Sequence, residues 1–69
     1  MWTVVECRMD PADPTCPRLS LDGTRKNPGT WLPAYRDTVD GVQVVKVRGE
    51  ASGPVWLDDG TGPRRVYPR

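Results

Sequence analysis

Two stretches of the chain alternate apolar and polar positions with the period of a β-strand. One face of residues 2–9, if extended, carries Thr3, Val5, Cys7 and Met9. The opposite face of that stretch carries Glu6 and Arg8. Residues 42–48 repeat the pattern, with Val45 and Val47 on one face and charged residues on the other. This alternation predicts antiparallel strands that bury one side only.

Proline and glycine leave almost no room for a helix. The chain holds eight Pro and seven Gly, and after residue 10 no stretch free of both exceeds seven residues. A typical helix needs about 11–12 residues, and an interior Pro costs about 3 kcal/mol. Short strands fit the remaining windows, and Pro33 should bend one of them or place it at a sheet edge. The predicted strands lie near 2–9, 18–22, 30–39, 42–48, 54–58 and 63–67.

Asp-Gly occurs three times, at residues 22–23, 40–41 and 59–60. This dipeptide suits turns that need positive φ and is a strong signal for a hairpin between strand-like segments. The spacing of 18 and 19 residues therefore predicts successive hairpins.

These patterns predict an all-β fold of five or six short antiparallel strands. Residues 1–69 are treated as a single small domain, with loops near 10–17, 23–29 and 49–54. Two architectures remain open: a hairpin-built barrel of SH3-like or OB-like type, which would remove exposed strand edges, or an irregular sandwich. A chain of 69 residues buries only about 60% of its unfolded surface, so its core is thin.

The two cysteines admit three interpretations. Cys7 and Cys16 bracket a Pro-rich loop, and a disulfide across it would contribute roughly 2–3 kcal/mol on the chain-entropy account. No feature marks the chain as secreted, so two free structural thiols are favoured over the disulfide. Zinc is the weakest interpretation, because the sequence has no His and no CxxC pair.

Catalytic chemistry finds little support. Without His, neither a serine nor a cysteine has a credible base, and no phosphate-binding glycine loop is present. Asp58 and Asp59 precede Gly60 in a predicted turn, where Asp is favoured for local hydrogen bonds to the backbone. We therefore expect no enzymatic activity and no cofactor or metal.

Aromatic residues and a basic terminus supply the candidate contact residues. Each Trp is part of the thin core, part of an interface or part of a ligand cage, and alternation turns Trp2 and Trp56 away from the core. The segment 64–69 carries three Arg and no acid, which suits phosphates or an acidic protein surface. The candidate interface residues are Trp2, Trp31, Trp56, Arg64, Arg65 and Tyr67.

Three functions follow as hypotheses. The favoured one is a non-enzymatic protein-interaction or structural module, an accessory subunit of a larger assembly that binds a protein partner or further copies of itself. Eight Arg against two Lys, with no Ile or Phe, favours a GC-rich genome and suggests a phage virion component. The alternatives are a nucleic-acid-binding barrel, disfavoured by the net charge of +1, and a small inhibitor that inserts loop 10–17 into a host enzyme.

The expected location is the cytoplasm or a virion. The first ten residues lack the basic start and apolar core of a signal peptide. No apolar stretch approaches the 18 residues of a membrane span.

Overall fold

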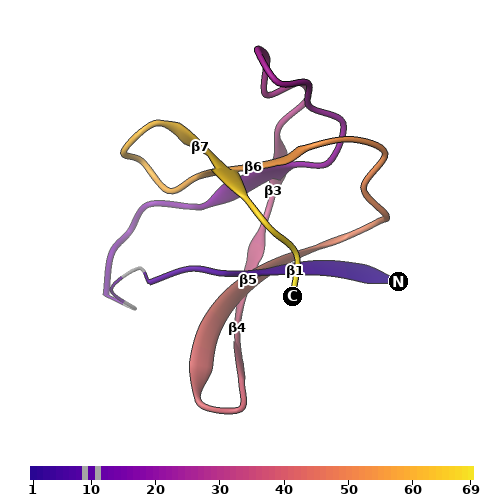
Figure 1. Cartoon of the computed structure of the whole chain (residues 1–69). Helices are drawn as coiled ribbons and strands as arrows, with labels where there is room; N and C mark the ends of the chain where they lie inside the picture. Colours follow the sequence, from indigo (N-terminus) through magenta and orange to yellow (C-terminus); the bar gives the residue numbers. More distant parts are fainter. Residues whose placement is uncertain (9, 11) are drawn as a thin grey trace.

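Seven short strands and no helix make up the described part of the chain, residues 1–8, 10 and 12–69 of a computed structural model (Figure 1). The all-β prediction is confirmed, with one strand more than expected. The strands are β1 (Trp2–Glu6), β2 (Arg18–Ser20), β3 (Leu32–Pro33), β4 (Tyr35–Val39), β5 (Val42–Arg48), β6 (Val55–Asp58) and β7 (Pro63–Val66).

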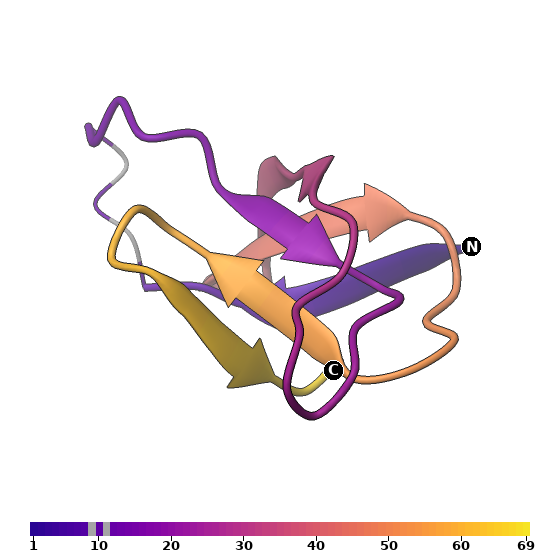
Figure 2. The same ribbon diagram turned by 90° about the horizontal axis from the view of Figure 1, so that it is seen from above.

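The strands form two antiparallel sheets that pack face to face. One has three strands in the order β1-β5-β4, and the other has four in the order β3-β2-β6-β7. Figure 2 shows the two layers, with β2, β6 and β7 lying over β1 and β5. The sheets are not closed into a barrel, so of the two predicted architectures the sandwich is the one observed.

The core lies between the sheets, on the faces that alternation predicted. Thr3, Val5 and Cys7 of the first strand region are buried, as expected, while Met9 lies outside the described residues. The buried apolar cluster is Val5, Cys7, Leu19, Leu21, Val45, Val47, Val55 and Leu57. Apart from Cys7, all its members are Val or Leu, and none is aromatic.

The predicted strand 30–39 is two strands in different sheets. β3 pairs with β2, and β4 pairs with β5. Ala34 lies between them, and its N–H donates to the Pro17 carbonyl oxygen at 3.0 Å. Pro33 lies at the sheet edge, as expected, because proline cannot supply the N–H that a central strand needs. This segment carries the chain from one layer of the sandwich to the other.

Two of the three Asp-Gly pairs form hairpin connections. Asp40 and Gly41 have φ of 53° and 78°, the pair of positive values that a two-residue β4–β5 hairpin requires. Asp59 and Gly60 lie in the short loop between β6 and β7. The first pair is different, since Asp22 and Gly23 begin a long loop from β2 to β3 rather than a tight turn. The prediction of a tight hairpin turn at residues 22–23 was therefore wrong.

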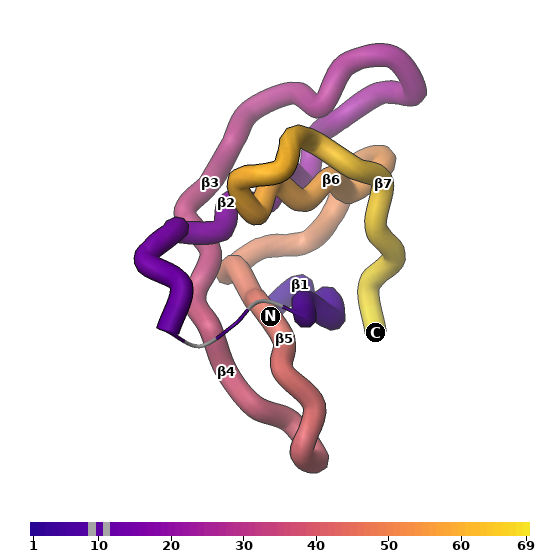
Figure 3. Tube along the Cα trace, turned by 90° about the vertical axis from the view of Figure 1, so that its left-hand side faces the viewer, coloured from indigo at the N-terminus to yellow at the C-terminus, as the bar shows by residue number. Residues whose placement is uncertain are grey.

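The C-terminal tail leaves the four-stranded sheet and runs beside β1. The Arg69 N–H donates to the Val4 carbonyl oxygen at 2.8 Å. Figure 3 shows the tail descending from β7 toward the edge of the other layer. Since an unpaired edge strand is a site for unwanted pairing, the tail protects part of the β1 edge.

Candidate functional site

The outer face of the four-stranded sheet is partly covered by a loop of the chain itself. This loop, residues 21–31, connects β2 to β3. Ser20 points to this outer face and is nevertheless 0% exposed. The Trp56 indole Nε1–H donates to the Thr24 carbonyl oxygen at 3.2 Å, which ties the loop to β6. The part of this face around Ser20 and Trp56 is therefore occupied, while Arg18, Pro63 and Arg65 on the same face stay exposed.

Hydrogen bonds from both ends hold the covering loop in place. The Asp22 carboxylate accepts from the Thr30 N–H at 2.8 Å and from the Ser20 hydroxyl at 3.1 Å. The Ser20 hydroxyl also contacts the Pro28 carbonyl oxygen. The hydrogen bond from the Thr30 backbone is the main cause that lowers the pKa of Asp22 below its ordinary value. The loop therefore closes on an ionised carboxylate.

Acid should weaken this closure. A carboxyl group whose folded pKa is lowered adds stability above its unfolded pKa, and that contribution is lost as the pH falls through the folded pKa. We expect Asp22→Asn to be less stable than wild type at pH 7 and the difference to shrink below about pH 4. Urea unfolding at pH 7, 4 and 2.5 measures it. A difference that stays constant with pH would contradict a role for the charge.

The outer face of the three-stranded sheet is largely exposed, apart from Val44 at 1% exposure, and we call it the aromatic face. Strand register defines it, because residues opposite each other in neighbouring strands share a face. Lys46 of β5 lies opposite Val4 and Tyr35, and Val44 lies opposite Glu6 and Asp37. The face consists of Trp2, Val4, Glu6, Tyr35, Asp37, Val39, Val42, Val44, Lys46 and Arg48.

Trp2, Tyr35 and Lys46 form a cluster on the aromatic face. The Trp2 and Tyr35 rings meet edge to face, with centroids 6.2 Å apart and planes at 84°. The Lys46 Nζ lies 4.9 Å from the Trp2 ring centroid and 2.9 Å from an Asp37 carboxylate oxygen. The hydrogen bond from Lys46 is the main cause that lowers the pKa of Asp37. The cluster thus holds two rings and an ion pair in a defined arrangement on one face of the sheet.

Much of this aromatic and aliphatic area is exposed. Trp2 is 47% exposed and Tyr35 62%, and Val39 and Val42 extend the apolar area toward the hairpin. Of the large apolar side chains that are exposed, four lie on this face. A gathering of exposed apolar groups rimmed by charges is typical of a binding surface.

Of the predicted tryptophans, only Trp2 belongs to the aromatic face. Trp56 does turn outward, as alternation predicted, but the covering loop packs against it. Trp31 is half-buried, and the Arg18 guanidinium carbon lies 5.9 Å from its ring centroid. The structure therefore separates the three residues that the sequence grouped together.

The predicted basic end is largely engaged within the chain. Arg64 forms an ion pair with Asp59 at 3.1 Å. The Arg65 guanidinium donates to the Val55 carbonyl oxygen at 3.0 Å and lies 4.7 Å from the Tyr67 ring centroid. Tyr67 is 74% exposed. Arg64 and Arg65 belong to β7 of the other sheet, and Tyr67 follows them into the C-terminal tail, where it lines a pocket with Glu6.

Sequence reasoning missed Tyr35, Val39 and Val42 as contact residues. The sequence does carry an alternating pattern here, since an extended strand puts Tyr35, Asp37 and Val39 on one face and the two residues between them on the other. Both faces of this strand carry polar residues, so alternation alone does not indicate which face is exposed. All five residues of β4 are in fact exposed.

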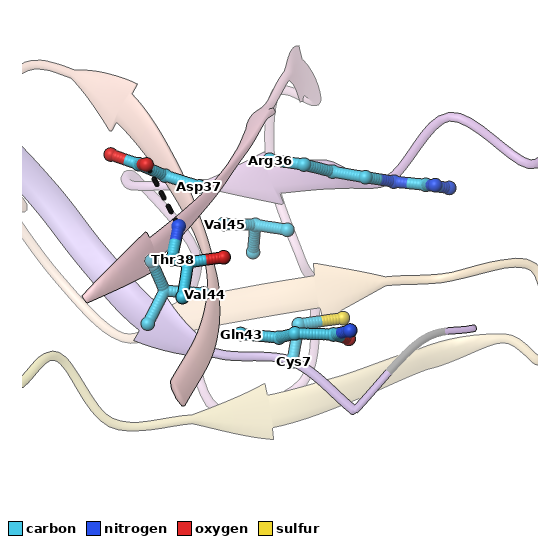
Figure 4. A pocket seen from close by; sticks show the side chains of 7 residues that line it. All are labelled: Cys7, Arg36, Asp37, Thr38, Gln43, Val44 and Val45. Atoms are coloured by element: carbon cyan, nitrogen blue, oxygen red, sulfur yellow. Dashed lines mark hydrogen bonds between the residues drawn. The ribbon is translucent and has the colours of Figure 1, made fainter. Parts of the chain in front are cut away.

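Cys7 is buried and Cys16 is exposed, and no disulfide joins the two. Cys7 lines a pocket of about 180 Å³ near the β4–β5 hairpin, which Figure 4 shows in close-up. The other lining residues are Arg36, Asp37, Thr38, Gln43, Val44 and Val45. Ligand pockets typically hold about 300–1,000 Å³, so this one is too small for an ordinary organic ligand.

Arg36 has a structural task beside this pocket. Its guanidinium donates to the Asp13 carbonyl oxygen at 2.9 Å and also contacts the Thr15 carbonyl oxygen. Asp13 in turn accepts from the Thr15 N–H at 2.9 Å, a bond that is the main cause of its lowered pKa. The part of the predicted inhibitory loop around Asp13 and Thr15 is thus fastened to β4.

A second pocket, of about 410 Å³, lies between the C-terminal tail and β1. Its lining residues are Val5, Glu6, Val66, Tyr67, Pro68 and Arg69.

Among the described residues, no three His, Cys, Asp or Glu side chains are grouped as metal ligands would be. Asp59 accepts from the Thr61 hydroxyl at 2.6 Å, the main cause of its lowered pKa, as expected for a turn carboxylate. The described part of the chain contains no helix of the length and hydrophobicity that a membrane span requires.

No protein-family model matches the chain, and neither a curated protein nor a solved structure matches it. The class that the fold defines is a small all-β protein with two antiparallel sheets in a sandwich-like arrangement.

Proposed function

We propose that this protein is a non-enzymatic protein-interaction module, an accessory subunit of a larger assembly, that binds through the aromatic face. The observation that carries the proposal is the difference between the two outer faces. One is partly covered by loop 21–31, while the other leaves Trp2 at 47% and Tyr35 at 62% exposure. Trp and Tyr are the residues most often found at the energetic centre of protein interfaces.

The physical advantage of such a partner is stability as well as recognition. The core is built mainly of Val and Leu from two small sheets. Covering Trp2 and Tyr35 removes apolar area from water, at about 25 cal/mol per Å² before the cost of association. Such a subunit acts in the cytoplasm or within an assembly such as a phage virion from a GC-rich host, which the arginine-rich composition favours.

A protein partner is supported better than a nucleic acid. The aromatic face carries Lys46 and Arg48 but also Glu6 and Asp37, so its charges cancel. The basic terminus that motivated nucleic-acid binding has Arg64 paired with Asp59. Inhibition of a host enzyme is a special case of the proposal, in which the partner is an enzyme.

The test compares two exposed tyrosines on different surfaces. Tagged wild-type protein, Tyr35→Glu and Tyr67→Glu are used to capture partners from the native source, with quantification by mass spectrometry. We expect the partner to be lost with Tyr35→Glu, by tenfold or more, because the substitution removes an exposed ring from the aromatic cluster and puts a charge in its place. Tyr67→Glu should retain the partner, since Tyr67 follows β7 of the other sheet and its ring lies against Arg65.

The opposite pattern would overturn the proposal. A partner lost with Tyr67→Glu and kept with Tyr35→Glu would move the contact to the β7 end. A wild type that retains only nucleic acid would replace the protein partner by the alternative. Circular dichroism of each variant confirms that the comparison is between folded proteins.

A further inference from the structure

The charges of the aromatic face are segregated along the strands. Beside Trp2, Tyr35 and Val4 lie the two cations of the face, Lys46 and Arg48. Two register positions further along, toward the hairpin, lie both its carboxylates, Glu6 and Asp37, opposite Val44. The face therefore has an aromatic half with two positive charges and an aliphatic half with two negative charges. The aliphatic half ends in Val39 and Val42.

Such a surface is complementary to itself under a two-fold rotation. An axis lying in the plane of the face, across the strands, brings the aromatic half of one copy over the aliphatic half of another. Both contacts then join a doubly positive patch to a doubly negative one and rings to valines. In an isologous dimer the same patch meets itself in this way, so a single arrangement satisfies both copies.

Two of the four charges have no ion partner inside one copy. Lys46 is paired with Asp37 at 2.9 Å. Glu6 and Arg48, by contrast, make no salt bridge with any residue in the described part of the chain. Both are exposed and lie in opposite halves of the face. They are therefore available to pair across the two-fold axis.

The size of the face sets the strength of the association. Strands spaced about 4.8 Å apart and about 3.4 Å per residue give three strands of up to seven residues a footprint of roughly 14 by 24 Å. Stable interfaces bury about 800 Å² per partner, roughly a sixth of the 4682 Å² of this molecule. The footprint, roughly 340 Å², is less than half of that area, which indicates a weak dimer that forms and dissociates with concentration.

We infer that the partner of the aromatic face is a second copy of this chain, joined face to face by a two-fold axis that sets Lys46 and Arg48 of each copy against the carboxylates of the other. This inference rests on the proposed function, because it names the occupant of the same face. It differs in its consequence, since the purified chain alone must associate.

The experiment is sedimentation velocity of the purified chain from about 1 µM to 1 mM, a range that brackets a weak dimer. Wild type should shift from monomer to dimer within this range. Lys46→Glu and Glu6→Lys should each weaken association at least tenfold, because each sets like charges against each other. An equimolar mixture of the two variants should recover it, since the reversed charges attract in the mixed dimer. Lys26→Glu, the same charge reversal in loop 21–31, should leave association unchanged.

Each other outcome removes the inference. A wild type that stays monomeric at 1 mM, a dimer unaffected by Lys46→Glu, or a mixture that does not recover would overturn it. Because Lys46 packs on the Trp2 ring, Arg48→Glu serves as a second variant if Lys46→Glu unfolds. A monomer that still loses its captured partner with Tyr35→Glu would remove this inference and leave the proposed function intact. A dimer that forms through this face while Tyr35→Glu still captures the partner would keep this inference and remove the proposed function.

Discussion

Replacing Leu57 by alanine is expected to remove a large share of the protein's free energy of unfolding at 25 °C. Leu57 is 0% exposed at the centre of the four-stranded sheet, opposite Leu19, which is equally buried. Truncating such a leucine costs about 2–5 kcal/mol, through lost burial and the cavity left behind. A domain of this size has about 3–10 kcal/mol of stability in total. Urea unfolding followed by circular dichroism measures the loss.

The matched control is Leu32→Ala, the same change at a leucine of β3 that is 37% exposed. Its cost should stay below about 1 kcal/mol, as for surface substitutions in general. Equal costs at the two positions would show that the core does not lie between the sheets. Recovery of Leu57→Ala stability at high protein concentration would instead indicate that association supplies part of the folding energy.

Replacing Gly23 by alanine should release the covering loop. A Cβ at this position would lie 2.5 Å from the Trp56 Nε1 and 2.8 Å from the Pro28 carbonyl oxygen. The indole can move only by giving up its hydrogen bond to Thr24, and the Pro28 carbonyl belongs to the backbone. Overpacking of this kind costs about 1–3 kcal/mol. Urea unfolding, together with faster hydrogen exchange at the Thr24 and Thr30 amides, would report it.

Gly41→Asn is the control for this substitution. A Cβ at Gly41 meets no atom within 4 Å, and its φ of 78° is one that asparagine tolerates. The change should alter stability by less than about 0.5 kcal/mol. If Gly23→Ala is equally mild and its loop amides stay protected, the loop does not pack as tightly on Trp56 as the geometry requires.

The strands and their inner faces were predictable because they depend on local pattern. Val5 and Val45 were placed in the core by alternation, and both are buried. The Asp40–Gly41 hairpin followed from the backbone conformation that these two residues favour. Both are properties of residues within a few positions of each other.

The division at Ala34 and the role of Asp22 were not predictable in this way. Ala34 separates two strands because its N–H bonds to Pro17, which is distant in sequence. Asp22 receives the Thr30 N–H only once the long loop has closed. An Asp-Gly pair gives the same signal in a tight hairpin and at the start of a long loop, because both conformations suit its residues.

The candidate surface depended on tertiary structure most of all. The sequence identified Trp2 as an outward-facing residue, but it grouped Trp2 with Trp56 and the basic end. Which outward face is covered is set by loop 21–31, whose contact with Trp56 spans 32 residues. Only the register of β4 against β5 brings Tyr35 beside Trp2.

The sequence by itself determined that this is a small β protein, where its main hairpin lies and which residues form its inner faces, because alternation, proline and glycine act over a few residues. The tertiary structure alone decided that the sheets form a sandwich, that one outer face is partly closed by a loop and that the other collects the exposed rings and segregated charges. Those features arise from contacts between segments far apart in the chain, whose geometry is fixed only when the two layers pack.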